Sequence, residues 1–156
     1  MARYTHESLS VWWVTTLSST TSPLATQINA GSVLTASVPV DGVNISGTRN
    51  NASQAMLGDA FVTEEPGTWG TGIEITMVRE SVSDTLWALF AGAYKTTGWI
   101  VIRRTGTGVA AAAQKVEVYP ATTHEPQMLA SAENEYSKFT VNFAVTAKPE
   151  LEATVA

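Results

Sequence analysis

The sequence predicts a β-dominated α+β fold: an antiparallel sandwich or barrel-like sheet, one short helix packed on it, and a long projecting loop. Residues 136–147 alternate between polar side chains and the apolar Phe139, Val141 and Phe143, which is the period of a strand with one buried face. Residues 72–80 repeat this alternation. Two such strands indicate an antiparallel sheet whose other face lies away from the core.

The bulk composition narrows the class of protein. The chain has 156 residues, a formal net charge of −5 and no cysteine. A chain of this length can bury about two-thirds of its unfolded surface in one core, so one domain over residues 1–156 is expected. The lack of cysteine excludes disulfides and Cys-ligated zinc, and the acidic surplus disfavours nonspecific binding of nucleic acid. No apolar run has the length of a membrane helix, so no membrane insertion is expected.

The N-terminal part of the chain is predicted to form a strand, a connection and a hairpin. Residues 1–30 contain a β-prone run at 11–14, followed by a connection rich in Ser, Thr and Pro. Asp41 and Gly42 stand between two pairs of β-branched residues, which is typical of a two-residue hairpin turn. Pro39 cannot donate to a sheet, so the first strand of this hairpin is expected at an edge.

A long loop is predicted at residues 49–71, where the hydrophobic periodicity disappears. Loops of this length are uncommon in compact domains and are usually functional or disordered. The composition is compatible with disorder. The alternative is a loop that projects and packs against another copy of the chain. Of its five large apolar residues, which include Val62, the predicted anchors are Met56, Leu57, Phe61 and Trp69.

One helix is predicted from Ser81 to Gly92. Ser81 and Asp84 fit a capping box, and Leu86, Leu89 and Phe90 fall on one helical face. A helix this short must lie on the sheet to be stable. The remaining predicted segments are strands at 98–104 and 114–119, a glycine-rich turn region at 105–113 between them, and a C-terminal arm at 148–156.

No pattern supports enzymatic chemistry, a cofactor or a metal site. Residues 106–111 match a permissive dinucleotide fingerprint, but too few residues follow for the helix that this motif requires. His6 and His124 are far apart and have no second ligand at metal spacing. The five tryptophans could form a sugar-binding platform, although most lie in regular elements and are expected to pack in the core or at an interface.

Several segments resemble the major tail tube proteins of long-tailed bacteriophages of the siphophage type. The similar segments are INAGSVLTASVPVDGVNISGTRN, GIEITMVRESVSDTLWALFAG and VEVYPATTHEPQMLASAENEYSKFTVNFAVTAKP. The resemblance implies a virion protein, assembled in the host cytoplasm, that forms hexameric rings stacked into a hollow tube. It also implies that the long loop reaches an adjacent ring, and that DNA passes through the lumen without specific binding. Implied partners are further copies of the chain, the tape measure protein, the tail terminator and distal tail proteins.

Such a tube needs strands that are apolar toward the helix and polar toward the channel. On this hypothesis Glu74, Thr76, Thr140 and Asn142 face the lumen. Lys138 shares this face, so it is expected to pair with Glu135 or Glu80 or to lie at a joint between subunits. Two other functions stay open: a β-sandwich module of a tail or baseplate that binds carbohydrate or a cell surface, and a terminator or connector ring.

Overall fold

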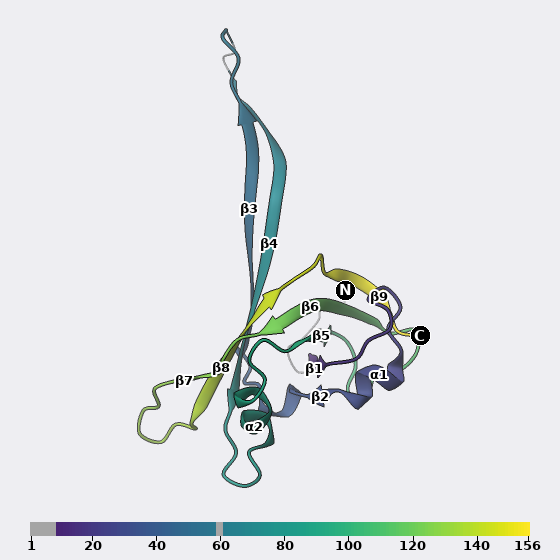
Figure 1. Ribbon diagram of the computed structural model, residues 1–156, viewed down its shortest axis with the longest axis vertical. Helices are drawn as coiled ribbons and strands as arrows, with labels where there is room; N and C mark the ends of the chain where they lie inside the picture. The colour runs from purple at the N-terminus through teal and green to yellow at the C-terminus, as the bar shows by residue number, and fades with distance from the viewer. Residues whose placement is uncertain (1–8, 59–60) are drawn as a thin grey trace.

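The computed structural model describes residues 9–58 and 61–156, which form a compact body with one long hairpin rising from it (Figure 1). The helices are α1 (Ala25–Ala30), the 3₁₀ helix Thr35–Ser37 and α2 (Thr85–Ala91). The strands are β1 (Ser10–Val14), β2 (Ser32–Val33), β3 (Val43–Gln54), β4 (Thr63–Val78), β5 (Thr97–Arg103), β6 (Lys115–Thr123), β7 (Gln127–Met128), β8 (Lys138–Val145) and β9 (Glu150–Thr154). The predicted β-dominated α+β class is confirmed.

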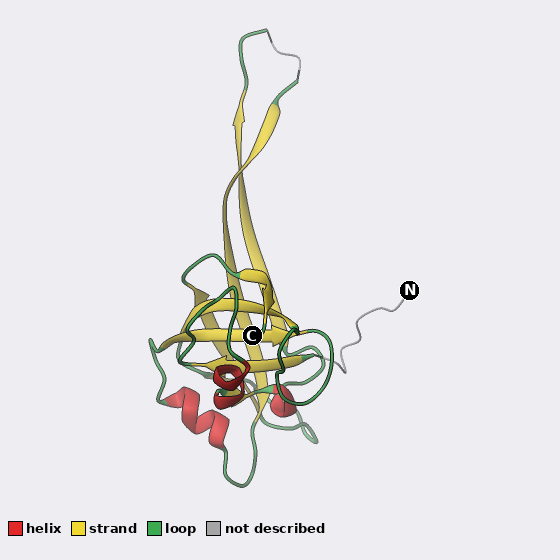
Figure 2. Ribbon diagram, turned by 90° about the vertical axis from the view of Figure 1, so that its right-hand side faces the viewer, coloured by secondary structure: helices red, strands yellow, loops and turns green. Residues whose placement is uncertain are grey.

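The described strands form a single antiparallel sheet in the order β2-β1-β5-β6-β8-β4-β3. Strand β6 is shared: residues 121–123 pair with β8, whereas Lys115, Val116 and Val118 pair with β9. β7 adds to the free part of β8. The sheet therefore divides at β6, and its two parts curl around the body, with the helices on the side away from the hairpin tip (Figure 2).

The strands at the centre of the body are buried on both faces. In β1, Val11 and Trp13 belong to one hydrophobic cluster, and Trp12 and Val14 belong to a second cluster on the opposite face. The run SVWWV is continuously apolar after Ser10, because each side chain meets a packed layer. The tryptophans of this strand are thus core residues, as the sequence predicted.

The first cluster lies between the sheet and α2. Phe90 of α2 is fully buried, and its ring makes a T-shaped contact with Phe143 at 5.8 Å between centroids. Trp13 contacts the same Phe143 at 5.3 Å. Ile73 and Ile75 of β4 join this cluster, so the apolar faces of both predicted strands pack under the helix.

The helix is shorter than predicted, and the expected capping box is absent. α2 begins at Thr85, and Asp84 precedes it without a side-chain cap. The Asp84 carboxylate instead accepts a hydrogen bond from Arg79 Nε at 2.6 Å. Ser83 has a φ of 54°, which a helix starting at Ser81 cannot contain. The predicted end at Gly92 is confirmed.

The two predictions around the early hairpin and the long loop were wrong in their local structure. Residues 38–42 form a turn closed by a hydrogen bond from Gly42 N to Pro39 O, so no hairpin forms there. β3 instead pairs with β4 along its whole length, and residues 49–54 and 63–71 are strand rather than loop. The ribbon projects as expected. Both of its faces are exposed beyond the body, so its sequence lacks the alternation of apolar and polar residues that predicts a strand.

Two further differences concern the ends of the chain. The C-terminal arm at 148–156 contains β9, which pairs with β6 and places Ala153 and Val155 in the second cluster. Residues 25–30, predicted as part of a connection, form α1, whose buried Ile28 packs in the same cluster. Neither segment has the length or periodicity that would have predicted it, because each is stabilised by tertiary contacts.

Candidate functional site

The four polar residues singled out on β4 and β8 form two adjacent cross-strand pairs. Glu74 lies opposite Asn142, and Thr76 lies opposite Thr140. The Oγ1 atoms of the two threonines are 3.0 Å apart and share a hydrogen bond. Since neighbouring residues of a strand point to opposite faces, all four side chains point away from the cluster that contains α2.

These pairs extend into rows across further strands. Asn44 of β3 lies opposite Glu74, which gives the row Asn44, Glu74 and Asn142. Gln127 of β7 lies opposite Thr140 and extends the second row. The sequence alone does not indicate Asn44 and Gln127, because only strand pairing brings them next to Glu74 and Thr140. The resulting surface, which we call the polar face, consists of amides, hydroxyls and one carboxylate.

The members of the polar face differ in accessibility. Glu74 and Asn44 are exposed, Thr76 and Asn142 are half-buried, and Thr140 is only 6% exposed. Thr140 therefore supports the face through its bond to Thr76 and presents little surface itself. Lys138 stands at the end of this face opposite Val78. In the described part of the chain it forms no ion pair with Glu135 or Glu80, so the other predicted alternative, a place at a joint between subunits, stays a prediction.

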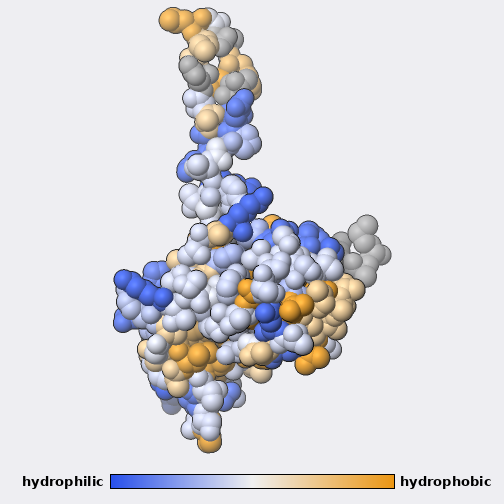
Figure 3. All heavy atoms as spheres, turned by 45° about the vertical axis from the view of Figure 1, so that its right-hand side comes forward, coloured by the Kyte–Doolittle hydropathy of each residue, from blue (hydrophilic) through white to orange (hydrophobic). Residues whose placement is uncertain are grey.

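The four predicted anchor residues are divided between the two ends of the hairpin. Met56, Leu57 and Phe61 lie at the tip, where 60%, 110% and 79% of their surfaces are exposed. Trp69 lies at the root instead, opposite Arg49 in the β3–β4 pairing. Apolar atoms thus gather at the tip above a largely hydrophilic stalk (Figure 3). Nothing in the described chain covers them.

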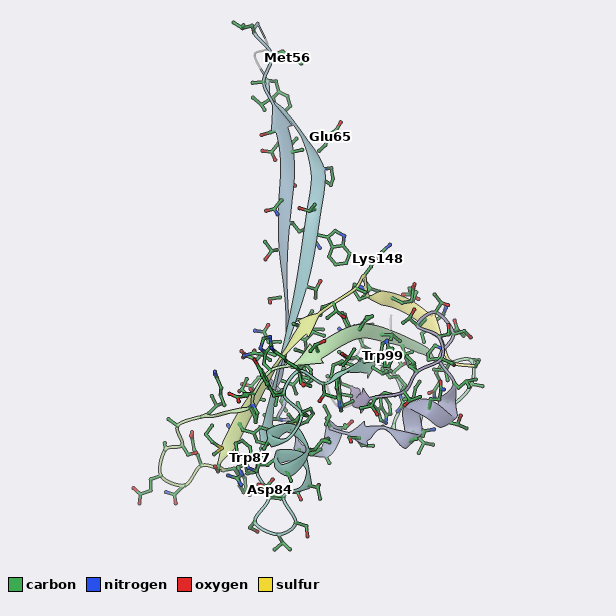
Figure 4. The ribbon with its side chains drawn as sticks, in the orientation of Figure 1. Met56, Glu65, Asp84, Trp87, Trp99 and Lys148 are labelled. Atoms are coloured by element: carbon green, nitrogen blue, oxygen red, sulfur yellow. The ribbon has the colours of Figure 1, made fainter. Side chains whose placement is uncertain are left out.

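A groove lies beside the hairpin root. Its walls are Trp69, Gly70 and Thr71 of β4 on one side and residues 145–149, which connect β8 to β9, on the other. Its volume is about 310 Å³. Lys148 is exposed at this groove, close to the point where the hairpin leaves the body (Figure 4). No local sequence pattern indicates this groove, because its two walls lie far apart along the chain.

The glycine-rich segment that matches a dinucleotide fingerprint is a loop folded around a buried arginine. Arg103 is fully buried and donates to the backbone oxygens of Gly106, Gly108 and Val109. Its guanidinium also lies 5.2 Å from the centroid of the Trp12 ring. The carbonyl groups point inward and no helix follows, so the segment cannot cradle a phosphate as the motif would. Burial lowers the pKa of Arg103.

A second arginine is held by an acidic partner at the surface. Arg104 and Glu117 form a two-pronged ion pair, and the Tyr119 hydroxyl donates to Glu117 Oε2 at 2.8 Å. The hydrogen bond to Glu117 raises the pKa of Arg104, and burial raises the pKa of Tyr119 well above its usual range. These shifts favour the forms already present near neutral pH, so they stabilise the pair rather than prepare an acid or a base.

In the part of the chain that the structure describes, histidine and carboxylate side chains do not gather into a metal site. His124 is exposed at the end of β6, while His6 lies outside the described residues. Among residues 9–58 and 61–156 there is no group of three or more metal-binding side chains placed to hold an ion. The same residues contain no helix long and apolar enough to cross a membrane.

Comparison with known proteins finds a matching family model and a similar solved structure. A family model described as phage tail tube protein matches residues 1–156. A chain in the cryo-EM structure of the anti-feeding prophage baseplate, 6-fold symmetrised, has a similar fold, with a TM-score of 0.63 at 10% identity. The similarity covers 98% of this chain and 97% of the other. The comparison with curated protein sequences found no match.

Proposed function

Because the chain belongs to the phage tail tube protein family, we propose that it forms rings of six copies that stack into the tube of a siphophage tail. The protein is a structural component of a phage tail and hence of the virion. In this proposal the subunits assemble in the host cytoplasm, and the tube is the conduit through which the genome leaves the particle.

The polar face carries the proposal. It backs directly onto the apolar face that packs under α2, as the wall of a channel requires. Its side chains are amides, hydroxyls and the carboxylate of Glu74, and the cation Lys138 stands at one end. Such a surface does not attract phosphate groups, whereas a lining of basic side chains would bind the DNA backbone and slow it. We therefore place Glu74, Thr76, Asn142 and, beneath them, Thr140 at the lumen.

The open edges of the sheet support assembly into rings. Among the described strands, β3 pairs only with β4, and β2 pairs only with β1, so each presents an unpaired edge. Exposed edges normally lead to association with other strands. The similar baseplate structure is itself 6-fold symmetrised, which agrees with a ring of six. We propose that neighbouring sheets join through these edges and close a continuous inner wall.

The hairpin supports stacking of the rings. Its tip carries exposed Met56, Leu57 and Phe61 at the end of a long ribbon, far from any surface of its own body (Figure 4). We propose that this tip buries its apolar side chains in a subunit of the adjacent ring. The tape measure protein would occupy the lumen during assembly, and the terminator and distal tail proteins would contact the two ends of the tube.

A baseplate ring is the second candidate function. It is favoured by the similar fold in the anti-feeding prophage baseplate. A protein of this kind would also form a ring around a channel, but its ring would not polymerise. The two functions differ in whether identical rings stack on one another.

Electron microscopy of the concentrated purified protein and of particles that carry it distinguishes these functions. We expect hollow tubes of stacked sixfold rings with the polar face on the inner wall. Isolated rings that never stack would support the baseplate function instead. Compact monomers, or rings with the polar face on the outside, would contradict both proposals.

A further inference from the structure

The groove at the hairpin root has a basic and aromatic character that the isolated chain does not neutralise. Trp69 lines it and is 50% exposed, and Lys148 is exposed at its opposite wall. Arg49 lies opposite Trp69 in the sheet, so its side chain emerges on the same face of the ribbon. The chain as a whole is acidic, with a net charge of −5. We call Arg49, Trp69 and Lys148 the basic groove.

The cations of the basic groove differ in their surroundings from Arg79 and Arg104. Arg79 pairs with Asp84, and Arg104 pairs with Glu117. By contrast, no ion pair joins Arg49 or Lys148 to any other residue that the structure describes. Two cations beside an exposed indole ring form a surface suited to an acidic segment that also carries an aromatic side chain.

Such a segment lies at the opposite end of the same molecule. Residues 129–137, between β7 and β8, form a loop that extends away from the hairpin side of the body (Figure 1). The loop carries exposed Glu133 and Glu135, and Tyr136 is 78% exposed. Glu135 Oε2 accepts a hydrogen bond from Ala132 N, which helps to hold the loop in shape. Glu133 forms no ion pair with a described residue.

We propose that the loop 129–137 of one copy docks in the basic groove of the next copy along the tube. In this interface Glu133 pairs with Lys148, and Tyr136 packs against Trp69 beside the positive charge of Arg49. The inference rests on the proposed function, because it requires copies stacked in the direction of the hairpin. The contact is head-to-tail: two different surfaces of the same chain meet, and such a contact repeats without limit when it does not close.

The charge pattern favours a second copy of the chain, rather than DNA, as the occupant of the basic groove. A phosphate backbone could also bind two cations, but both lie beside the exposed root of the hairpin, away from the polar face proposed for the channel. Docking of the acidic loop neutralises cations and carboxylates that have no ion partners among the described residues of the isolated chain. It also gives the stack a direction, since the groove and the loop occupy opposite ends of the subunit.

The test uses charge reversal and its rescue in the full-length protein. Lys148→Glu places two carboxylates in contact at each proposed joint, and Glu133→Lys places two ammonium groups there. We expect each single variant to raise the concentration needed for tube formation by about tenfold at low salt, measured by sedimentation and electron microscopy. Combining Lys148→Glu with Glu133→Lys restores the opposite charges and should return this concentration to near the wild-type value. Glu135 is left intact because it shapes the loop.

The matched control makes the same change of charge at another exposed lysine. Lys95→Glu changes the net charge as Lys148→Glu does, but Lys95 lies in the turn between α2 and β5 and contacts Tyr94. This variant should form tubes normally, and its combination with Glu133→Lys should show no rescue. Thermal unfolding of each unassembled variant checks that the fold is intact, since all three side chains are exposed or lie in loops.

The outcomes separate this interface from the proposed function. Tubes that form equally well with Lys148→Glu would overturn the interface and leave the tube proposal intact, as would a loss that the double variant does not reverse. If the groove binds a different tail protein instead, Lys148→Glu should form tubes as well as the wild type. Wild-type protein that forms no tubes would overturn the proposed function, and the interface with it.

Discussion

The strands at the centre of the body and the outer part of the hairpin have the same backbone structure in opposite surroundings. All five residues of β1 are buried, with apolar layers on both faces. In the hairpin, every described side chain in 46–53 and 64–70 is exposed. Backbone hydrogen bonds therefore form both regions, but only the body stabilises itself by burial. An isolated two-stranded ribbon is marginal in water, so we expect a partner copy to complete the hairpin in the assembly.

Two glycines show the same difference between the body and the hairpin. Gly98 lies in the body, where a Cβ atom would stand 2.7 Å from the Trp13 ring, so no larger residue fits. Gly70 lies in the hairpin, and a Cβ atom there would meet nothing within 4 Å. Packing within the chain therefore requires glycine at position 98, whereas no contact within the chain requires it at position 70. A glycine within a strand often marks the close approach of another backbone, which agrees with a hairpin that works in an assembly.

The largest effect is expected when the body loses an aromatic side chain. Trp13→Ala removes a ring that contacts both Phe90 and Phe143. The resulting cavity should lower the free energy of unfolding by about 3–5 kcal/mol, measured by denaturant titration of the unassembled protein. Trp69→Ala is the matched control, because Trp69 is half exposed at the hairpin root. Equal losses from the two variants would contradict the contrast between body and hairpin.

The next effect concerns the buried arginine of the body. Arg103→Met removes the donor to the carbonyl groups of Gly106, Gly108 and Val109 and to the hydroxyl of the buried Ser10. We expect a loss of about 2–3 kcal/mol together with faster amide exchange in residues 105–114. Arg104→Met is the control: its partly exposed ion pair should contribute less than about 1 kcal/mol. Unchanged exchange in the loop would show that Arg103 does not hold it.

A smaller effect is expected at the polar face. Thr140→Val removes one hydroxyl of the pair with Thr76 and keeps the shape of the side chain. The loss should be about 1 kcal/mol, and a double-mutant cycle with Thr76→Val should recover most of it as coupling between the two positions. If the two losses simply add, the hydroxyls do not interact and the pair contributes nothing specific to this face.

The smallest effect on the isolated chain is expected at the hairpin tip. Leu57 is fully exposed, so Leu57→Ser should leave the unfolding midpoint of the unassembled protein unchanged. The same variant should assemble poorly, because the proposed anchor is lost. Leu151→Ser, an exposed leucine on β9, is the control for assembly. Normal tubes with Leu57→Ser would contradict the role proposed for the tip.

The sequence predicted those parts of the fold in which one face of a strand is buried. The alternation of Phe139, Val141 and Phe143 with polar residues predicts β8 and places Thr140 and Asn142 on the face opposite the cluster that contains α2. The exposed ribbon could not be predicted in this way, because neither of its faces is apolar and periodicity reports burial rather than hydrogen bonding. The resemblance to tail tube proteins implies a projecting element, and the structure shows that this element is the paired ribbon of β3 and β4.

The candidate site was predicted only where its residues lie on recognised strands. Glu74 and Thr76 were found from the period of β4, whereas Asn44 and Gln127 depend on which strands become neighbours. The sequence groups Trp69 with the tip residues, because all of them fall in one segment without periodicity. Strand pairing places it beside residues 145–149 instead. Long-range pairing of this kind leaves no local signal in a single sequence.

Amide hydrogen exchange of the unassembled and assembled protein shows whether a partner copy completes the hairpin. We expect β1, β5 and β6 to be protected in both states, whereas residues 46–53 and 64–70 should exchange rapidly in the free subunit and become protected in the assembly. A hairpin that is as protected in the free subunit as the body, or one that stays unprotected after assembly, would contradict the claim that a partner copy completes it.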